Sequence, residues 1–454
     1  MAATHTYLST SFADQLQPEQ RKSDVDIAVL LLSMCLFFAV GMPIAFALAL
    51  SALVGALWID LPVAAVMQQL SSGVGKVSML TVPFFVLAGA IMAEGGMARR
   101  LVDFAAVVVG FTRIRGGLSQ VNILATTIMS GISGSSVADT SAIGSVMIPQ
   151  MAAKGYPRVF ATNVTISASV QAILVPPSHN AVIYSLATGG VVSITSLFLA
   201  GIVPGLLLGF AIMLLCLYFA YRDGHPKGEP VPVKQALKML GDATWGIVTL
   251  VIVLGGILTG VFTPIEAGAV ACVWAFFVTM FIYRDYKWSE LPMLTYRTLQ
   301  TVAMVLTLVA TASCFGYVAA MMQMPMHMTE FFVAISSNKY VLLMWLNIML
   351  LILGTALDLA PLLLICTPIL LPVVKSFGID PVHFGIVMLL NLGIGLLTPP
   401  VGTTLFVGCA IGKVSVDEVM RGIWPFYWVM FAVLMLVTYV PWFSMALPHA
   451  FGFR

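Results

Sequence analysis

The stretch "GISGSSVADTSAIG", residues 131–144, places hydroxyl side chains, glycines and one carboxylate in a chain built mostly from apolar segments. Asp139 is the only charged residue in it. A charged side chain at the centre of a membrane helix costs about 2.5–3.5 kcal/mol, and such residues usually mark ion or proton pathways. If the surrounding chain lies in a membrane, the stretch therefore predicts a polar site at membrane depth.

The composition is that of a membrane protein. Of 454 residues, 60% are hydrophobic and only 9% are charged, and the mean hydropathy is +1.02, whereas a soluble domain carries about 25% charged residues. Apolar runs at 27–58, 191–221, 245–283 and 426–447 are as long as, or longer than, the roughly 20 residues that cross a bilayer as a helix. A membrane β-barrel would show alternating segments of about ten residues. The sequence predicts an all-α polytopic membrane protein.

Two halves of the chain resemble each other. Pro176-Pro177 and Pro399-Pro400 are its two Pro-Pro pairs and lie 223 residues apart. Matching strings keep nearly the same offset: "PQMAAKGYPRVF" (149–160) with "PVVKSFGIDPVHF" (372–384), and "VGMPIAFALA" (40–49) with "VFTPIEAGAV" (261–270). The expected organisation is a polar tail at 1–26, a first repeat at 27–221, a linker at 222–244, a second repeat at 245–447 and a C-terminal tail at 448–454.

Each repeat contains two interruptions of its apolar segments, a feature typical of secondary transporters. They lie at 133–139, 174–180, 354–361 and 396–404. Residues 117–151 and 340–374 are interpreted as re-entrant hairpins of two half-length helices, and residues 160–188 and 384–411 as helices broken at Pro-Pro, which removes two backbone donors. Such irregular backbone persists at membrane depth only against protein or a water-filled cavity.

Charge placement predicts that the repeats are inverted. Arg113, Arg115, Lys154 and Arg158 flank the first hairpin without a neighbouring acid, whereas Asp380 follows the second. Because positive residues favour the cytoplasmic side, we expect the first hairpin to enter from the cytoplasm and the second from outside.

The four interruptions carry the oxygen ligands that a sodium ion requires, namely hydroxyls, carboxylates and carbonyls freed by broken helices. Lys and Arg are absent from them, so an anionic substrate would depend on helix N-termini and hydroxyls. Simpler roles stay open: serine and glycine can serve helix packing, and Asp139 can cap the returning hairpin helix. We expect Glu94 to pair with Arg99 or Arg100, and Glu266 to cap a helix beginning at Pro264. The six cysteines show no disulfide or metal spacing.

The strings "SGISGSSVADTSAIGSVMIPQM", "GVFTPIEAGAVA", "DPVHFGIVMLLNLGIGLLTPPVGTTLFV" and "GGMARRLVDFA" closely resemble the large membrane subunit, DctM type, of tripartite ATP-independent periplasmic (TRAP) transporters, from about residue 27 to the C-terminus. The resemblance implies an elevator-type fold of the ion transporter superfamily and sodium-driven uptake of an organic acid, such as a C4-dicarboxylate, sialic acid or sugar acid, across the bacterial inner membrane. It implies two partners, a small four-helix membrane subunit as a separate chain and a periplasmic substrate-binding protein. Na⁺ is then the coupling ion, and no other cofactor is expected.

The resemblance also assigns site residues. By motif, the sodium and substrate sites would comprise Ser133, Gly134, Ser135, Ser136, Asp139, Pro176, Pro177 and Ser178 in the first repeat, and Thr355, Asp358, Thr398, Pro399, Pro400, Val401 and Gly402 in the second. Relatives often carry hydroxyls after the second aspartate, where this chain has Leu359 and Ala360. His179 and Asn180 replace apolar residues and are candidates for substrate selectivity.

One alternative function stays open, and two others are disfavoured. A stand-alone anion or dicarboxylate carrier of the same superfamily would need no binding protein. An intramembrane aspartyl protease is disfavoured because neither Asp139 nor Asp358 has the Tyr-Asp or Gly-x-Gly-Asp context, so no enzymatic activity is expected. A channel is disfavoured because paired broken helices suit alternating access.

Overall fold

The computed structural model describes residues 25–112, 114–228 and 232–453, and these residues are helical without any β-strand. The expected N-terminal tail at 1–26 therefore lies outside the described residues except for its last two residues. Arg113, one of the residues used to predict orientation, also lies outside them. Within these described ranges, eight helices are long and apolar enough to cross a membrane: 77–94, 194–222, 233–258, 264–283, 288–321, 339–356, 359–376 and 416–439. The prediction of an all-α polytopic membrane protein is confirmed.

The chain divides into two compact units that do not follow the repeat boundary. The described part of the smaller unit comprises residues 25–76, 304–337 and 364–378. Its helices are Val25–Ala39, α2 (Ile44–Trp58), α3 (Val63–Val74) and α15 (Met324–Ile335), with the C-terminal parts of α14 (Leu291–Met321) and α17 (Leu359–Ser376). The apolar run 27–58 is thus two helices, because Gly41 adopts a positive φ and Pro43 starts α2.

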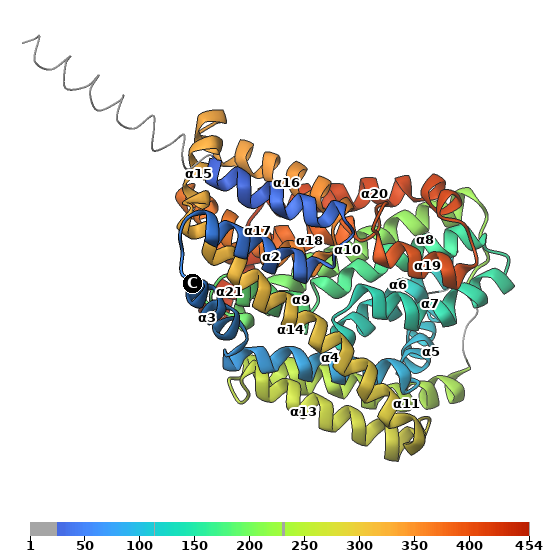
Figure 1. The fold of residues 1–454 in the computed structure, drawn as a ribbon. Helices are drawn as coiled ribbons and strands as arrows, with labels where there is room; N and C mark the ends of the chain where they lie inside the picture. The colour runs from blue at the N-terminus through green and yellow to red at the C-terminus, as the bar shows by residue number, and fades with distance from the viewer. Residues whose placement is uncertain (1–24, 113, 229–231, 454) are drawn as a thin grey trace, which may run out of the picture. The chain divides into compact units, whose positions relative to one another are not determined.

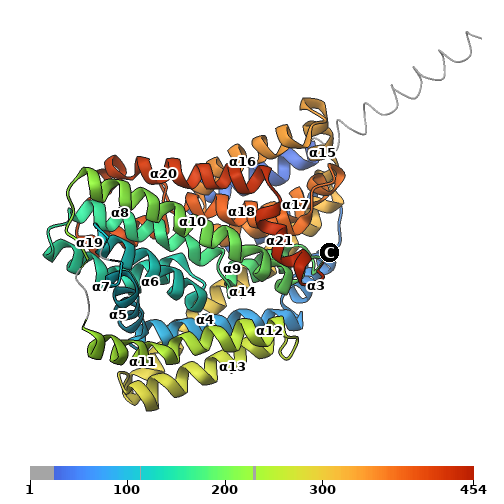
Figure 2. The same cartoon turned by 180° about the vertical axis from the view of Figure 1, so that it is seen from behind.

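The larger unit contains residues 77–303, 338–363 and 379–454. Within it α4 (Thr81–Glu94) packs against α13 (Pro264–Phe277), and α11 (Val233–Leu250) packs against both α13 and α5 (Met97–Gly110). Figures 1 and 2 show α4, α11 and α13 side by side from opposite directions. The apolar run 245–283 is two helical segments separated by a turn at 259–263, where Gly260 has a positive φ.

The two segments expected to be hairpins are each a pair of helices joined by two residues. The first pair is α6 (Gly117–Ser133) and α7 (Ser136–Ala153), and the second is α16 (Lys339–Ala356) and α17. The expectation of half-length helices was wrong. At 1.5 Å per residue, helices of 17 and 18 residues are about 26 Å long, close to the roughly 30 Å hydrocarbon core. The short connections leave nearly all residues of each segment for the helices.

The two Pro-Pro segments interrupt helices at corresponding places. In the first half α8 (Arg158–Ser169) continues as a 3₁₀ turn, η2 (Val170–Ile173), before the break, and α9 (His179–Ala187) follows it. In the second half the break separates α18 (Pro381–Gly395) from α19 (Thr403–Gly412). In each pair the peptide bond between the two prolines is cis.

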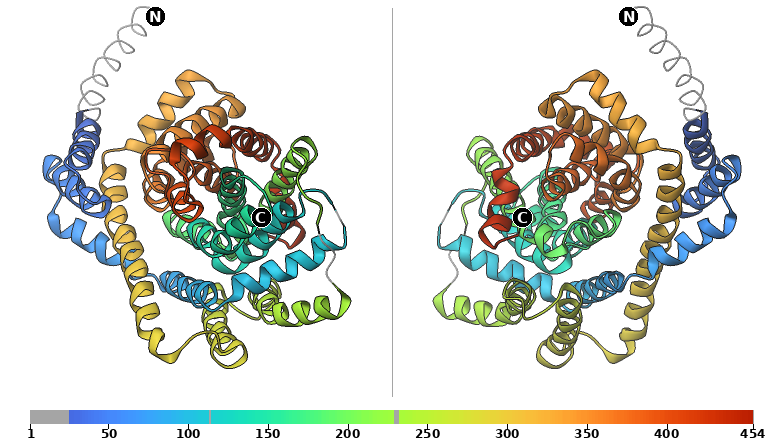
Figure 3. Two further views of the ribbon diagram at one scale, coloured as in Figure 1. Left: turned by 90° about the vertical axis from the view of Figure 1, so that its right-hand side faces the viewer. Right: turned by 90° about the vertical axis from the view of Figure 1, so that its left-hand side faces the viewer.

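The helices that follow also correspond between the halves. α10 (Ile194–Arg222) begins after the N-cap Ser193, and α20 (Val416–Tyr439) begins after the N-cap Ser415. The starts of α6, α8, α9 and α10 precede those of α16, α18, α19 and α20 by 222 to 224 residues. In both views of Figure 3 the first-repeat helices in cyan to green lie beside the C-terminal helices in red, and α7 and α8 contact α19.

Two segments expected to be irregular are partly helical. α11 occupies the linker from Val233 onward, and α21 (Trp442–Ala450) extends into the expected C-terminal tail. Both helices bury small residues against their neighbours, for example Ala236 and Ala243 of α11 and Ser444 of α21, which explains why polar composition did not prevent helix formation.

The two acidic residues expected to be structural have partners at the ends of helices. Thr263 and Glu266 form a capping box at the start of α13, with Pro264 in the first turn, so that prediction is confirmed. Glu94 instead accepts hydrogen bonds from Arg297 (3.3 Å) and the Tyr286 hydroxyl (3.0 Å). The expected pairing with Arg99 or Arg100 was wrong, because Arg100 donates to Asp285 at 2.6 Å.

A row of glycines on α10 allows it to approach the first broken segment. Gly201, Gly205 and Gly209 recur every four residues and so lie on one helix face. A Cβ at Gly201 would overlap the carbonyl oxygen of Leu174, and one at Gly205 would lie 2.6 Å from Cγ2 of Val175. This small-residue packing, common between membrane helices, holds the unwound backbone beside α10.

We predict that Gly201→Ala lowers stability by about 1–3 kcal/mol, the usual cost of overpacking, because its Cβ meets backbone that cannot rotate away. Gly241→Ala is the matched control, since Gly241 is helical with nothing within 4 Å of an added Cβ, and it should be neutral or stabilising by up to about 1 kcal/mol. Thermal unfolding of the purified chain measures both. Equal effects of the two variants would contradict the packing assigned to Gly201.

Candidate functional site

The first hairpin tip is formed by the two residues between α6 and α7. Gly134 ends α6 with a left-handed φ of 63°, which glycine adopts without cost. Ser135 is extended, and its hydroxyl caps α7 by accepting from the Ala138 amide (3.4 Å). The capping role considered for Asp139 therefore belongs to Ser135.

Asp139 lies in the first turn of α7 and is completely buried. Its Oδ2 accepts a hydrogen bond from the Ser130 hydroxyl (2.6 Å), and its Oδ1 accepts one from the Ser133 hydroxyl. Among the described residues no cation forms an ion pair with it. The Ser133 oxygen also accepts from the Ser135 amide (3.2 Å). The carboxylate thus fixes two hydroxyls at the tip and leaves acceptor lone pairs on both oxygens.

The first tip packs directly on the first broken segment. A Cβ at Gly134 would overlap the Pro177 carbonyl oxygen and would lie 3.2 Å from the backbone nitrogen of His179. Ser178 links both sides of the break, because its hydroxyl donates to the Ile173 carbonyl (2.7 Å) and accepts from the Ala181 amide (3.4 Å) at the start of α9. Pro176, Pro177 and Asn180 are buried, and His179 is partly exposed.

The second tip is formed by Leu357 and Asp358, between α16 and α17. The hydroxyl of Thr403 donates to Oδ1 of Asp358 (3.2 Å). The Thr355 carbonyl accepts from the Val401 amide (3.3 Å), whereas the Thr355 hydroxyl turns back to Ile352 (2.8 Å). The second tip therefore contacts the second broken segment through both side chains and backbone.

Close helix crossing brings the second tip to the second break. A Cβ at Gly395, the last residue of α18, would lie 2.8 Å from the carbonyl oxygen of Gly354 in α16. Past this crossing, the Tyr427 hydroxyl of α20 donates to the Leu397 carbonyl (2.7 Å) and lies 3.2 Å from the Thr398 hydroxyl. A side chain of α20 thus provides a hydrogen-bond donor for one carbonyl of the unwound backbone.

The start of α19 connects the two hairpin tips. Thr403 donates to Asp358 of the second tip, and the neighbouring Thr404 hydroxyl lies 3.0 Å from the Ser136 hydroxyl of the first tip. Ser136 and Thr404 are both buried and are 268 residues apart in the chain. Residues from both repeats therefore converge on a single helix terminus inside the larger unit.

Helix ends give this region two kinds of electrostatic surface. α6, η2, α16 and α18 end at the tips and breaks and carry partial negative charge there, which suits a cation. α7, α9, α17 and α19 begin at the same places and carry partial positive charge, which suits an anion. The described residues contain no cluster of His, Cys, Asp or Glu that would hold a transition metal.

Four contributing residues are not among the residues assigned by motif: Ser130, Thr403, Thr404 and Tyr427. Ser130 precedes Ser133 by three residues and so shares its helix face, and Thr403 and Thr404 lie within the interruption at 396–404. These three carried a local signal. Tyr427 had none, because its contact with Leu397 depends on the packing of α20.

Comparisons with known proteins identify the family of the chain. The family profile described as "Tripartite ATP-independent periplasmic transporter, DctM component" matches residues 31–443. The C4-dicarboxylate TRAP transporter large permease protein DctM of Rhodobacter capsulatus is 36% identical over 425 residues, covering 91% of this chain and 96% of its own. The sialic acid TRAP transporter large permease protein SiaM of Vibrio cholerae is 38% identical over 384 residues, covering 85% and 89%.

Among solved structures, the YdaH transporter of Alcanivorax borkumensis has a similar fold. The TM-score is 0.58 at 14% sequence identity, over 87% of this chain and 90% of that chain. At this identity the likeness concerns the fold alone. Taken with the profile match over nearly the whole length and the two relatives above 35% identity, it leads to one conclusion. The chain belongs to the DctM family, the large membrane subunits of tripartite ATP-independent periplasmic transporters.

Proposed function

We propose that this protein imports an organic acid across the bacterial inner membrane with sodium as the coupling ion. It would act with a small membrane subunit and a periplasmic binding protein that delivers the substrate. The observation that carries the proposal is the convergence of both hairpin tips on the start of α19, through Thr403 with Asp358 and Thr404 with Ser136. A single site built from both repeats is the arrangement expected of a secondary transporter.

Sodium would bind at the two tips in different ways. At the first tip Asp139 accepts from Ser130 and Ser133, so their hydroxyl oxygens and nearby carbonyls would be the ligands and the carboxylate would act through them. At the second tip Asp358 accepts a hydrogen bond from the Thr403 hydroxyl and would supply negative charge to the ion directly. The C-terminal ends of the adjoining helices add to the attraction.

The substrate carboxylate would lie at the helix N-termini. α9 and α19 begin directly after the two breaks, and free amides at such ends bind anions. Relatives named for a C4-dicarboxylate and for sialic acid support an organic acid as the substrate class. His179 and Asn180 occupy the first turn of α9 and are the residues we propose to distinguish among such acids.

The transport cycle would move the site as one body. All four interruptions belong to the larger compact unit, which is consistent with an elevator movement of inverted repeats in which the tips and breaks travel together. Alternating access is largely rigid-body motion of one part of the transporter against another.

We predict that Asp358→Asn abolishes sodium-driven uptake while the protein stays folded, because the amide keeps the shape of the side chain but removes its charge. Uptake is measured in proteoliposomes with all three components and an inward sodium gradient. Asp223→Asn is the control, since that exposed carboxylate pairs with the adjacent Arg222 and should not be required. Uptake that is independent of sodium would refute the coupling, and uptake without the binding protein would favour a stand-alone carrier.

We further predict that Gly134→Ala weakens sodium binding, because the added Cβ displaces the first tip from Pro177. Gly155→Ala is the matched control: Gly155 also has a positive φ but has nothing within 4 Å of an added Cβ, so it reports backbone strain alone. Sodium at 100 times its Kd should stabilise the wild-type chain by about 2.7 kcal/mol. Thermal unfolding in NaCl and in choline chloride measures this increment.

Gly155→Ala should lower stability equally in both salts and keep the sodium increment. Gly134→Ala should reduce the increment itself. If both variants retain the full increment, the first tip does not contribute to the sodium site.

A further inference from the structure

Tyr427 of α20 contacts the second broken segment from outside it. The Tyr427 side chain is buried, and its hydroxyl donates to the Leu397 carbonyl at 2.7 Å. Leu397 lies two residues after Gly395, where α18 ends, so its carbonyl belongs to the interrupted backbone. A carbonyl at membrane depth is costly to leave without a donor. The Tyr427 hydroxyl therefore holds the Leu397 carbonyl in one orientation.

The same hydroxyl orients the side chain of Thr398. The Thr398 hydroxyl lies 3.2 Å from the Tyr427 hydroxyl and 3.2 Å from the Ile394 carbonyl. A tyrosine hydroxyl has one proton, and Tyr427 donates it to Leu397, so its oxygen can only accept from Thr398. The Thr398 proton is thus used within the protein, towards Tyr427 or Ile394. A lone pair of the Thr398 oxygen stays available to a cation.

The broken segment transmits this position to the second hairpin tip. The Thr398 carbonyl accepts from the Gly402 amide at 3.2 Å, and the next residue, Thr403, donates to Asp358. A Cβ at Gly402 would lie 3.0 Å from the Thr398 carbonyl oxygen and 3.3 Å from that of Leu396. Two backbone oxygens therefore lie close to Gly402, beside the hydroxyl that contacts Asp358. A shift of this backbone would move both.

The Tyr427 ring is positioned by packing outside the broken segment. Its centroid lies 5.9 Å from those of Trp424 and Phe431, which are on the same helix. The helix is placed in turn against α8 of the first repeat, because a Cβ at Gly422 would lie only 2.8 Å from Nδ2 of Asn163. The hydroxyl therefore reaches the second break from a helix that is held by the other half of the chain.

The first repeat has a leucine where the second has Tyr427. The strings "GIVPGLLLGFA" (201–211) of α10 and "GIWPFYWVMFA" (422–432) of α20 align without a gap and pair Leu206 with Tyr427. Leu206 has no hydrogen-bonding group and is 50% exposed. α10 instead approaches the first break through Gly201 and Gly205. One break is thus approached by glycines and the other by a hydroxyl donor.

We propose that Tyr427 is a positioning residue that sets the affinity of the second hairpin tip for sodium. It touches neither the ion nor the substrate. It holds the Leu397 carbonyl and leaves an oxygen lone pair of Thr398 for the ion, so that the segment next to Asp358 keeps a binding geometry. The first tip is independent of it. The inference rests on the proposed function, because it takes sodium as the coupling ion.

The test is the sodium dependence of uptake by Tyr427→Phe, which removes the hydroxyl and keeps the ring. Uptake is measured in proteoliposomes with all three components over a series of inward sodium gradients. The half-saturating sodium concentration should rise about tenfold, the size expected when a buried carbonyl loses its donor. The rate at saturating sodium should stay within about twofold, because only ion binding is weakened. A general structural defect would instead lower that rate at an unchanged half-saturating concentration.

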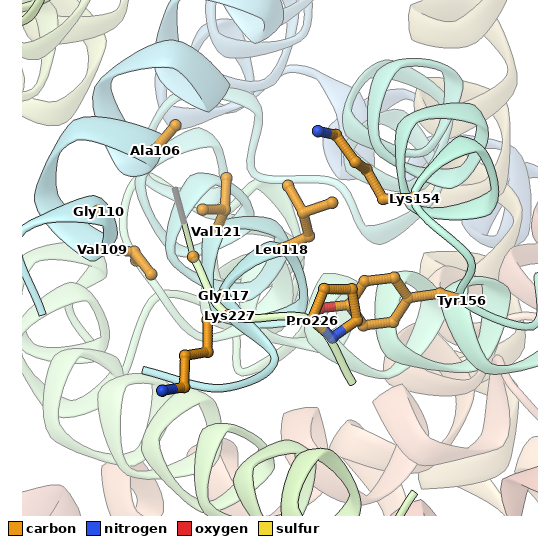
Figure 4. Close-up of a pocket in the computed structure, with 11 residues that line it drawn as sticks. Ala106, Val109, Gly110, Gly117, Leu118, Val121, Lys154, Tyr156, Pro226 and Lys227 are labelled. Atoms are coloured by element: carbon orange, nitrogen blue, oxygen red, sulfur yellow. The ribbon is translucent and has the colours of Figure 1, made fainter. Parts of the chain in front are cut away.

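Two other tyrosines supply matched controls. Tyr184 is buried, and its hydroxyl donates to the Pro381 carbonyl (2.7 Å), at the opposite end of α18 from the break. Tyr156 lines a cavity at the base of the first hairpin, shown in Figure 4, and its hydroxyl makes no hydrogen bond within the described residues. Tyr184→Phe and Tyr156→Phe should both keep the wild-type sodium dependence. If Tyr184→Phe weakens it as much as Tyr427→Phe does, the proposal fails.

A double variant tests the path through Thr398. Thr398→Val removes the hydroxyl and keeps the shape of the side chain, and it should also raise the half-saturating sodium concentration. In Tyr427→Phe/Thr398→Val the combined increase should be smaller than the product of the two single increases, because groups in contact are not independent. Increases that simply multiply would overturn the assigned coupling.

Sodium binding to the isolated chain provides a second measurement if Tyr427→Phe transports too slowly. Thermal unfolding in NaCl and in choline chloride gives the stabilisation by sodium. Near the wild-type half-saturating concentration this stabilisation should be smaller in Tyr427→Phe than in the wild type, and an unchanged value would overturn the proposal.

The outcomes separate this inference from the function on which it rests. Wild-type uptake that does not depend on sodium would refute the coupling, and the role of Tyr427 with it. If wild-type uptake requires sodium and Tyr427→Phe keeps the wild-type half-saturating concentration, the coupling stands and the role of Tyr427 is refuted.

Discussion

An unpaired peptide group in hydrocarbon costs several kcal/mol, and this chain interrupts its helices four times within apolar segments. The rest of the larger unit depends on how those interruptions are satisfied. Ser178 links the two sides of the first break, and Tyr427 caps the Leu397 carbonyl at the second. Gly201 and Gly354 provide the close approach that places helices against unwound backbone. The helices must therefore pack closely in order to supply hydrogen-bond partners to the unwound backbone.

The same requirement explains the small number of charged residues in the region. The tips hold two carboxylates, and within the described part of the chain each accepts hydrogen bonds from hydroxyls and forms no ion pair: Asp139 accepts from two serines and Asp358 from Thr403. A permanent ion pair would neutralise the charge that the proposed sodium site needs. Hydroxyl donors stabilise the carboxylate and keep oxygen lone pairs available, as that proposal requires.

The base of the first hairpin is held together by different kinds of contact from those at its tip. There the chain leaves one repeat and enters the next, and the linker is held to the hairpin by a few backbone hydrogen bonds and by the packing of His225 on Tyr156. The tip, by contrast, is held by hydrogen bonds from the Ser130 and Ser133 hydroxyls to Asp139.

The sequence by itself determined the class and the positions of the four interruptions, and it predicted two repeats, because composition, the Pro-Pro pairs and their spacing can be read directly along the chain. It also predicted the capping box of Thr263 and Glu266, which depends only on neighbouring residues. It failed for the lengths of the hairpin helices, since the number of residues in a turn is set by its conformation. It also failed for Glu94, whose partner Arg297 lies 203 residues away.

Only the tertiary structure decided which polar groups meet. The contact between Ser136 and Thr404, the donation from Tyr427 to Leu397, and the donation from Arg297 to Glu94 join segments that are distant in the chain. A single sequence carries no local signal for such pairs, because they arise from helix crossings that glycines such as Gly354 and Gly395 permit. The physical reason is that residue type sets what a group can bind, whereas packing sets what it reaches.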